Sequence, residues 1–417
     1  MTSETSSHIR IPVSSLYDIP MKPDAIRSFY HQYSASGNQK GHTILSLSDE
    51  MLTWVSGVFS EVSVSSPPPG PQWSSLIEIA KEQGFLGFLY YRISTAKLQS
   101  ILPESIYREL KREYHQYCVR SFAYEKQVCS LAHSLCTAGI EHLFLKGPAL
   151  GYQIYQSPNL RPFRDIDLLI RPDDFRAVSG ILQRLHYHST FDAFSTSSEL
   201  YHHQVFLPPL GSGYLPVELH WRPLYNPVHQ SSISFDALYC SSDLVSTPLG
   251  EIRSLSPEDA LIYACVHMSI QHAGEIRLIW MIDILLLINK IKQQNLWNCM
   301  AERIQLWNAG AVVKRTGGVI CLWFESSPLI GSVEWDAFDD GGSEDLNSAD
   351  RVSSGKEHKI WTQVHKMPTL AGKGRAIFHY FAATRAVHRT GKPANVLEYF
   401  NIWLSIVRIV MQRWRDG

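Results

Sequence analysis

The segment 143–172 limits the possible folds of this chain more than any other part of the sequence. Near its end, Asp165 and Asp167 alternate with apolar residues, a pattern that predicts a strand with both carboxylates on one face. Near its start, Lys146-Gly147-Pro148 follows a second apolar strand candidate and opens a predicted helix. A Lys-Gly turn at a helix N-terminus is suited to binding phosphate oxygens. Paired carboxylates beside such a turn are what metal-dependent nucleotide chemistry requires.

Size and composition exclude several classes of protein. A length of 417 residues is enough for roughly two or three domains. With 45% hydrophobic and 18% charged residues, the composition is globular rather than disordered. The formal net charge of -1 argues against a protein that binds nucleic acid through its overall charge. Charge is unevenly distributed, since the stretch 334–350 is acidic and the chain from Lys356 onwards is basic.

Cysteine usage and hydropathy predict a cytoplasmic protein. The seven cysteines include no CxxC pair, and we expect them to be buried free thiols in a reducing compartment. No quartet of potential ligands has the spacing of a zinc site. The N-terminus lacks the pattern of a signal peptide. The two longest apolar stretches, 276–291 and 402–411, are interrupted by charges and are too short for a bilayer span.

Four regions are expected along the chain. Residues 1–70 are predicted to be a weakly ordered arm and linker, because they lack periodicity and end in SSPPPG. Residues 71–138 form a predicted helical region, with either one long helix or two helices after Pro103. Residues 139–255 alternate strand and helix patterns, which predicts an α/β or α+β core. Residues 256–417 are predicted to be helical, with an acidic flexible loop at 341–355.

The individual elements follow from apolar periodicity and from the residues that begin and end them. Ser256 is a predicted helix cap and Pro257 the first residue of that helix. Strands are predicted at 140–145, 165–170, 204–207 and 215–220, and helices at 73–94, 148–155, 172–186, 258–271, 275–293 and 297–309.

Glu218 is the best candidate for a third carboxylate beside the aspartates. It alternates with apolar residues in a predicted strand, so it faces the metals of Asp165 and Asp167 if the two strands pair. Three carboxylates would hold divalent cations and help to deprotonate an attacking hydroxyl during displacement at phosphorus. The alternative is an exposed strand end whose aspartates are merely solvated. His220 lies two residues after Glu218 and contacts either a substrate or structural partners.

Three basic residues complete the candidate site, each with a structural alternative. Lys146 is expected to bind the β- or γ-phosphate, and the less favoured alternative is that it is a surface lysine at a turn. Arg161 and Arg164 are suited to clamp phosphates, since guanidinium matches oxyanions, but Arg161 fits a structural ion pair equally well.

Further along the chain, structural roles are favoured over roles in binding. His267 and His272 are five residues apart, a poor spacing for a metal pair on one helical face. Arg277 and Asp283 are expected to orient helices rather than to line the nucleotide cleft. The basic C-terminal helices are expected to be solvated or packed, with an anionic acceptor or a membrane surface as the alternative contact.

Three segments of the chain together resemble the bacterial nucleotidyltransferase-like family of the polymerase-β superfamily. They are LFLKGPALGYQIYQSPNLRPFRDIDLLI, VELHWRP and ALIYACVHMSIQHAGEIRLIWMIDILLLI. The resemblance covers roughly 73–308. It implies an α+β fold, in which a polymerase-β-like core of a small mixed sheet and flanking helices lies between N- and C-terminal helical regions. Asp165, Asp167 and Glu218 match the three metal carboxylates of the superfamily, and Gly147 occupies its phosphate-binding Gly-Ser turn. Pro148 replaces the usual Ser, so that hydroxyl contact is absent and the charge of Lys146 compensates.

The resemblance also implies an activity, the transfer of a nucleoside monophosphate from an NTP, with ATP favoured, in the presence of Mg²⁺ or Mn²⁺. The expected acceptor is a hydroxyl or phosphate of a small molecule or peptide, with release of pyrophosphate. Nucleic acid is a less favoured acceptor because the net charge is close to neutral. The alternatives are a catalytically degenerate nucleotide-binding or interaction protein, and a toxin-like transferase that modifies tRNA or protein.

Overall fold

The computed structural model describes residues 47–48, 50–51, 54–55, 72–189, 192–197, 201–224, 233–271 and 277–323. All of them lie in the first of the two units into which the chain divides, Met1–Lys366. The predictions for most of the arm at 1–70, for His272, for the acidic loop at 341–355 and for the basic C-terminal helices fall outside the described residues.

A six-stranded mixed sheet forms the centre of the described fold, with the strand order β3-β4-β2-β1-β6-β5. The pairs β2·β4 and β1·β6 are parallel, whereas β1·β2, β3·β4 and β5·β6 are antiparallel. This arrangement confirms the expected α+β class with a small mixed sheet. The strands are β1 (His142–Phe144), β2 (Ile166–Ile170), β3 (His203–Phe206), β4 (Val217–His220), β5 (Asp243–Thr247) and β6 (Gly250–Ser254).

The hairpin of β5 and β6 was not predicted. Each of its strands buries few side chains, chiefly Val245 in β5 and Ile252 in β6. An edge hairpin with so little burial lacks the apolar alternation by which strands are recognised in a sequence.

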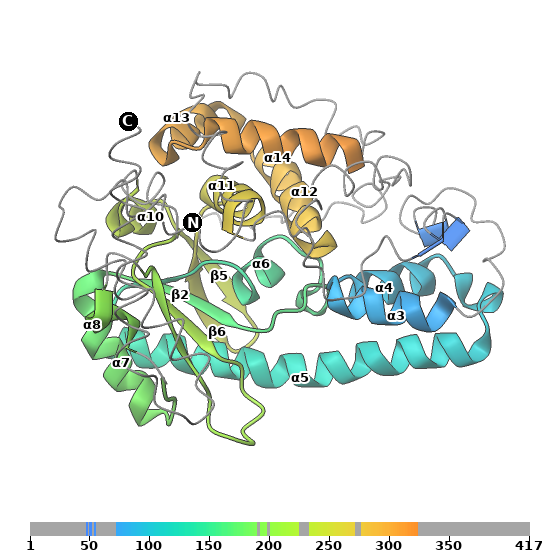
Figure 1. Cartoon of the computed structure of the whole chain (residues 1–417), viewed down its shortest axis with the longest axis horizontal. Helices are drawn as coiled ribbons and strands as arrows, with labels where there is room; N and C mark the ends of the chain where they lie inside the picture. Colours follow the sequence, from blue (N-terminus) through green and yellow to red (C-terminus); the bar gives the residue numbers. More distant parts are fainter. Residues whose placement is uncertain are drawn as a thin grey trace, which may run out of the picture. The chain divides into compact units, whose positions relative to one another are not determined.

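Helices cover both faces of the sheet (Figure 1). The helices α5 (Glu104–Thr137) and α7 (Phe175–Arg184) lie on one face, and α11 (Pro257–Val266), α12 (Leu278–Gln293), α13 (Trp297–Trp307) and α14 (Gly310–Trp323) lie on the other. No helix in the described part of the chain has both the length and the hydropathy of a membrane span. The remaining helices are α3 (Gln72–Glu82), α4 (Leu86–Thr95), α6 (Pro148–Gln153), α8 (Ala193–Ser197) and α10 (Phe235–Cys240).

Several predicted helices differ from the structure in their limits. The run at 73–94 is two helices, because Gly84 adopts a φ of 78° between α3 and α4. The region after Pro103 is one 34-residue helix, which decides between the two alternatives. The helix predicted at 172–186 begins as a 3₁₀ turn, Pro172–Asp174, and α11 continues as a π-helix, His267–Gln271.

Alternate residues of β1 and β2 pack into two different cores. Phe144 and Leu168 pack with α5 and α7, whereas Leu143 and Leu169 pack with the helices on the opposite face. This is the period of two expected for a sheet that is buried on both sides. Because Asp167 alternates with Leu168, its carboxylate lies on the face covered by the C-terminal helices.

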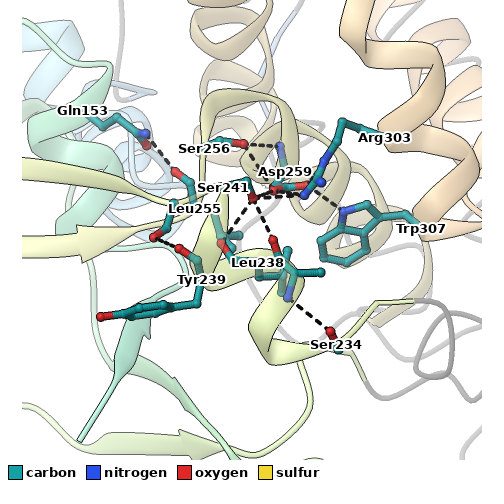
Figure 2. Close-up of polar contacts among 12 residues, drawn as sticks. Gln153, Ser234, Leu238, Tyr239, Ser241, Leu255, Ser256, Asp259, Arg303 and Trp307 are labelled. Carbon is teal, nitrogen blue, oxygen red and sulfur yellow. Dashed lines mark hydrogen bonds and ion pairs between the residues drawn. The ribbon is translucent and has the colours of Figure 1, made fainter. Parts of the chain in front are cut away.

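A buried carboxylate, Asp259, ties α11 to α13 and to the end of α10 (Figure 2). Its oxygens accept hydrogen bonds from Arg303 Nε and Trp307 Nε1, both at 2.9 Å, and from Ser241 Oγ at 2.9 Å. Arg303 makes a second, charged contact with it. Ser256 Oγ caps the helix by accepting a hydrogen bond from Asp259 N, which confirms the predicted helix start.

The described cysteines are free thiols, in agreement with the prediction. Their predicted burial holds for Cys265 but is wrong for Cys136, Cys240 and Cys299, which are exposed. Helical spacing alone did not identify the solvent side, because Cys136 lies at the exposed end of α5 and Cys240 at the end of α10.

We expect Asp259→Ala to lower the free energy of unfolding by about 3–5 kcal/mol, because it leaves the Arg303 guanidinium partly buried without its carboxylate. Urea unfolding of the purified protein measures this. Glu302→Ala is the matched control, since Glu302 is exposed on the same helix as Arg303 and its loss should change stability by less than about 0.5 kcal/mol. Equal effects of the two substitutions would contradict the role of Asp259.

Candidate functional site

The parallel pairing of β2 with β4 brings two predicted site residues side by side. Asp167 is the register partner of Glu218, so the strand of the glutamate pairs beside the strand of the aspartates, which is the condition on which Glu218 was chosen as the third carboxylate. Asp165 lies directly before β2 and shares the face of Asp167. Asp167 is buried, whereas Asp165 and Glu218 remain partly exposed. All three carboxylates therefore lie close together on the same face of the sheet.

Two basic side chains contact Asp167. Lys146 Nζ lies 3.2 Å and His220 Nε2 lies 3.1 Å from the same oxygen, Asp167 Oδ1. His220 Nε2 is also 3.6 Å from Glu218 Oε2. Burial alone would raise the pKa of Asp167, but Lys146 and His220 outweigh it and hold that pKa well below its usual range. The cluster keeps Asp167 ionised within the sheet.

Asp165 has the opposite electrostatic environment. Burial and the neighbouring charge of Asp167 raise the pKa of Asp165 to about 6. Burial would likewise raise the pKa of Glu218, but its contact with His220 leaves that pKa below its ordinary value. Two carboxylates in the same short segment thus differ in their ease of ionisation because only Asp167 contacts the cations directly.

The donor atoms near Asp167 suit a divalent cation. One ligand atom from each of Asp167, Glu218 and His220 lies within 4.8 Å of the others. Asp167 Oδ2 is buried and has no hydrogen-bond partner among the described residues. A buried carboxylate oxygen without a donor is costly unless a cation or another donor satisfies it. The residues present therefore fit a bound metal ion.

Gly147 adopts a conformation that other residues rarely take, with a φ of 56° between β1 and α6. A Cβ at this position would lie 3.4 Å from Phe163 Cβ and 3.6 Å from the backbone oxygen of Asp165. The Lys-Gly turn thus lies next to the segment that carries the aspartates. Pro148 is the first residue of α6, as predicted.

The structure places Arg161 in a buried ion pair rather than in the carboxylate cluster. Its Nη2 lies 2.7 Å from Asp283 Oδ2 and its Nε lies 3.0 Å from Asp283 Oδ1. Tyr155 donates a further hydrogen bond to Asp283. Two roles were considered for Arg161, and this contact corresponds to the structural ion pair. The pair also orients α12, which is the role expected for Asp283.

Arg164 is exposed and points toward the N-terminal helices. Its Nη2 donates a hydrogen bond of 3.3 Å to the backbone oxygen of Lys81. Arg164 does not contact the carboxylates in the described structure, although it directly precedes Asp165.

Helix α11 and the π-helix that continues it bring two further residues to the site, of which the sequence analysis missed Tyr263 and considered His267 only as a partner of His272. Lys146 Nζ lies 3.0 Å from His267 Nε2. Tyr263 is buried with a hydroxyl that has no hydrogen-bond partner among the described residues. Burial and the charges of the three carboxylates raise the pKa of Tyr263 well above its usual range. The spacing of four between Tyr263 and His267, which places both on one helical face, is the signal that could have found them.

A cavity of about 270 Å³ lies between the N-terminal helices and the segment that precedes the aspartates. Phe163 and Arg164 line it on the side of the aspartates, and Phe163 also lies next to Gly147. The long helix α5 contributes aromatic residues to the lining, namely Tyr114, Tyr117 and Tyr124. Lys81, Glu113 and Arg120 add charges of both signs.

Residues 69–325 match the model of a protein family described as uncharacterised nucleotidyltransferase. The chain belongs to this family. The match confirms the nucleotidyltransferase resemblance and extends beyond the range 73–308 on which it was based, whereas the polymerase-β superfamily and a bacterial origin stay predictions. No curated protein matches the chain.

Among solved structures, the chain is similar to an antigenic nucleotidyltransferase-like protein from Paracoccidioides brasiliensis, with 16% sequence identity and a TM-score of 0.27. The match covers 45% of this chain and 92% of that protein. A likeness this low supports no conclusion about function.

The two aspartates should affect stability in opposite directions. The pKa of Asp165 rises from 3.8 to about 6 on folding, so its ionisation above pH 6 disfavours the folded state. In metal-free buffer at pH 8, Asp165→Asn should raise the free energy of unfolding by on the order of 2 kcal/mol, and this gain should disappear by about pH 4.

Asp167→Asn should instead lower the free energy of unfolding at pH 8, because the lowered pKa of Asp167 means that its charged form stabilises the folded state. That loss should shrink as the pH falls through the range in which the wild-type carboxylate takes up its proton. Urea unfolding with EDTA at pH 4 and pH 8 compares the two variants. Changes of the same sign at pH 8 would contradict the assigned environments.

Proposed function

We propose that this protein transfers a nucleoside monophosphate from an NTP, with ATP favoured, to a hydroxyl or phosphate of a small-molecule or peptide acceptor. The observation that carries the proposal is the register of Asp167 with Glu218 across the parallel pair of β2 and β4, with Asp165 two residues earlier. Membership of a nucleotidyltransferase family supports the same reaction class. Pyrophosphate is the leaving group.

Asp165, Asp167 and Glu218 would hold Mg²⁺ or Mn²⁺. Carboxylate oxygens are the ligands that these cations prefer, and the buried Asp167 Oδ2 without a donor supports a cation at this position. When bound, such cations stabilise the charge on the attacking and leaving oxygens of an in-line displacement.

Lys146 and Glu218 have separate roles in the proposed reaction. Lys146 follows β1 at the Lys-Gly turn and lies beside Asp167, where its ammonium group is placed to bind the triphosphate. Glu218 is more accessible than Asp167, since its side chain is 26% exposed and that of Asp167 is fully buried. Glu218 therefore accepts the proton of the acceptor hydroxyl as the acceptor oxygen bonds to the α-phosphorus and the bond from that phosphorus to the departing pyrophosphate oxygen breaks.

The acceptor binds in the cavity lined by Phe163 and Arg164, which directly precede Asp165 in the chain. A cavity of about 270 Å³ lined by tyrosines suits a small molecule or the end of a peptide better than a long polyanion. Transfer from a labelled NTP to mixtures of metabolites and of peptides, followed by mass spectrometry, tests the acceptor class. Tyr114→Trp, which fills part of the cavity, should reduce transfer without weakening NTP binding.

The test of the function is a thermal-shift and pyrophosphate-release assay with each of the four NTPs. Stabilisation and pyrophosphate release should both require Mg²⁺ or Mn²⁺, and both should be lost in the double variant Asp165→Ala/Asp167→Ala. Stabilisation without pyrophosphate in the presence of the acceptor mixtures would indicate a binding protein and would overturn the proposal.

Glu218→Gln should lower turnover by at least ~100-fold and weaken nucleotide binding much less, because the substitution keeps the shape of the side chain but removes the base. Steady-state kinetics of pyrophosphate release, combined with calorimetric binding, separates the two effects. Glu251→Gln is the matched control, since Glu251 is exposed on β6 and should keep normal turnover. Normal turnover of Glu218→Gln would disprove the role of Glu218.

A further inference from the structure

Three histidines meet at the edge of the sheet beside the carboxylates. His203 of β3 is the register partner of His220 of β4, and His202 directly precedes β3. One ring nitrogen from each of the three lies within 4.8 Å of the others. The ring centroids are 4.3 Å apart for His202 and His203, and 5.0 Å apart for His203 and His220. His203 Nδ1 lies 3.0 Å from His202 Nε2, and a cluster of imidazoles this close could hold a metal ion.

The two nitrogens of His220 have different environments. Nε2 lies 3.1 Å from Asp167 Oδ1 and donates to it, so in the neutral ring Nδ1 carries the lone pair that a metal can bind. Nδ1 is buried and has no hydrogen-bond partner among the described residues, in a side chain that is only 3% exposed. A carboxylate that accepts from one nitrogen of a histidine while the other binds a metal is a recurrent arrangement at metal sites. Nδ1 is therefore a nitrogen that is suited to bind a metal.

We propose that His202, His203 and His220 bind a divalent transition-metal cation of the zinc class, at a site separate from the cation site of the three carboxylates. Imidazole nitrogen is a preferred ligand of Zn²⁺, Co²⁺ and Ni²⁺, whereas carboxylate oxygens suit Mg²⁺ and Mn²⁺. Three histidines leave a fourth tetrahedral position for water or a substrate group. The site is accessible because β3 is an edge strand and both His202 and His203 are partly exposed.

The proposed cation would position a residue of the carboxylate cluster. His220 contacts Asp167 through Nε2, so a metal on Nδ1 would hold the ring in its present orientation and keep the proton on Nε2. His220 would then act as a positioning residue for Asp167 and link the two cation sites. This metal binding does not depend on the proposed transferase activity.

The sequence analysis argued against a zinc site because these ligands come from two strands and show no local ligand spacing. His202 and His203 are adjacent, and His220 follows in the next strand, a spacing that matches no quartet pattern. Only the antiparallel register of β3 with β4 brings them together.

Titration of untagged, EDTA-treated full-length protein with Co²⁺ tests the proposal, because Co²⁺ bound by histidines has visible absorption bands that report its ligands. We expect one equivalent of Co²⁺ to bind with these bands and Zn²⁺ to displace it. His202→Ala/His203→Ala should weaken Co²⁺ binding by at least ~100-fold, as should the single variant His203→Gln. His133→Ala should bind normally, since His133 is exposed on α5.

The carboxylate variant Asp165→Asn/Glu218→Gln distinguishes the two cation sites. It should keep the Co²⁺ bands, because neither substituted residue is a ligand of the proposed histidine site. Circular dichroism confirms that each variant is folded. Loss of the bands in this variant, or their retention in folded His203→Gln, would show that Co²⁺ binds elsewhere and would overturn the proposal. A failure of nucleotide transfer alone would leave this result unaffected.

Discussion

The compensated charge of Asp167 is the interaction on which the rest of the site depends. A carboxylate in the middle of a mixed sheet is unfavourable unless charged or hydrogen-bonding partners accompany it, and Lys146 after β1 and His220 of β4 are such partners. These contacts connect the ends of three neighbouring strands, and Lys146 extends the cluster to His267 after α11. The charges thus join the sheet to the helices that cover it.

Two further buried carboxylates hold the C-terminal helices over this face. Asp283 binds Arg161 and so fixes α12 to the loop that precedes the aspartates. Asp259 binds Arg303 and Trp307 and so fixes α13 to α11, the helix that carries Tyr263. Each carboxylate accepts several hydrogen bonds, which is what makes a buried charge tolerable. The candidate site therefore lies between two rigidly connected layers.

The carboxylate cluster and the histidine cluster share one residue but differ in chemistry. Oxygen ligands favour Mg²⁺ or Mn²⁺ and nitrogen ligands favour zinc-like ions, so two cations can be discriminated at neighbouring positions. His220 lies between them, with Nε2 toward Asp167 and Nδ1 left for the second site. In this arrangement, the occupancy of one site would change the electrostatics of the other.

Local patterns in the sequence determined much of this protein. Because side chains alternate along a strand, Asp165 and Asp167 had to share a face, and Ser256 with Pro257 had to begin a helix. The tertiary structure alone decided that Glu218 stands beside Asp167, that Arg161 pairs with Asp283 rather than remaining free, and that three histidines converge. These contacts join residues far apart in the chain, and their register depends on how whole strands and helices pack, which no local periodicity encodes.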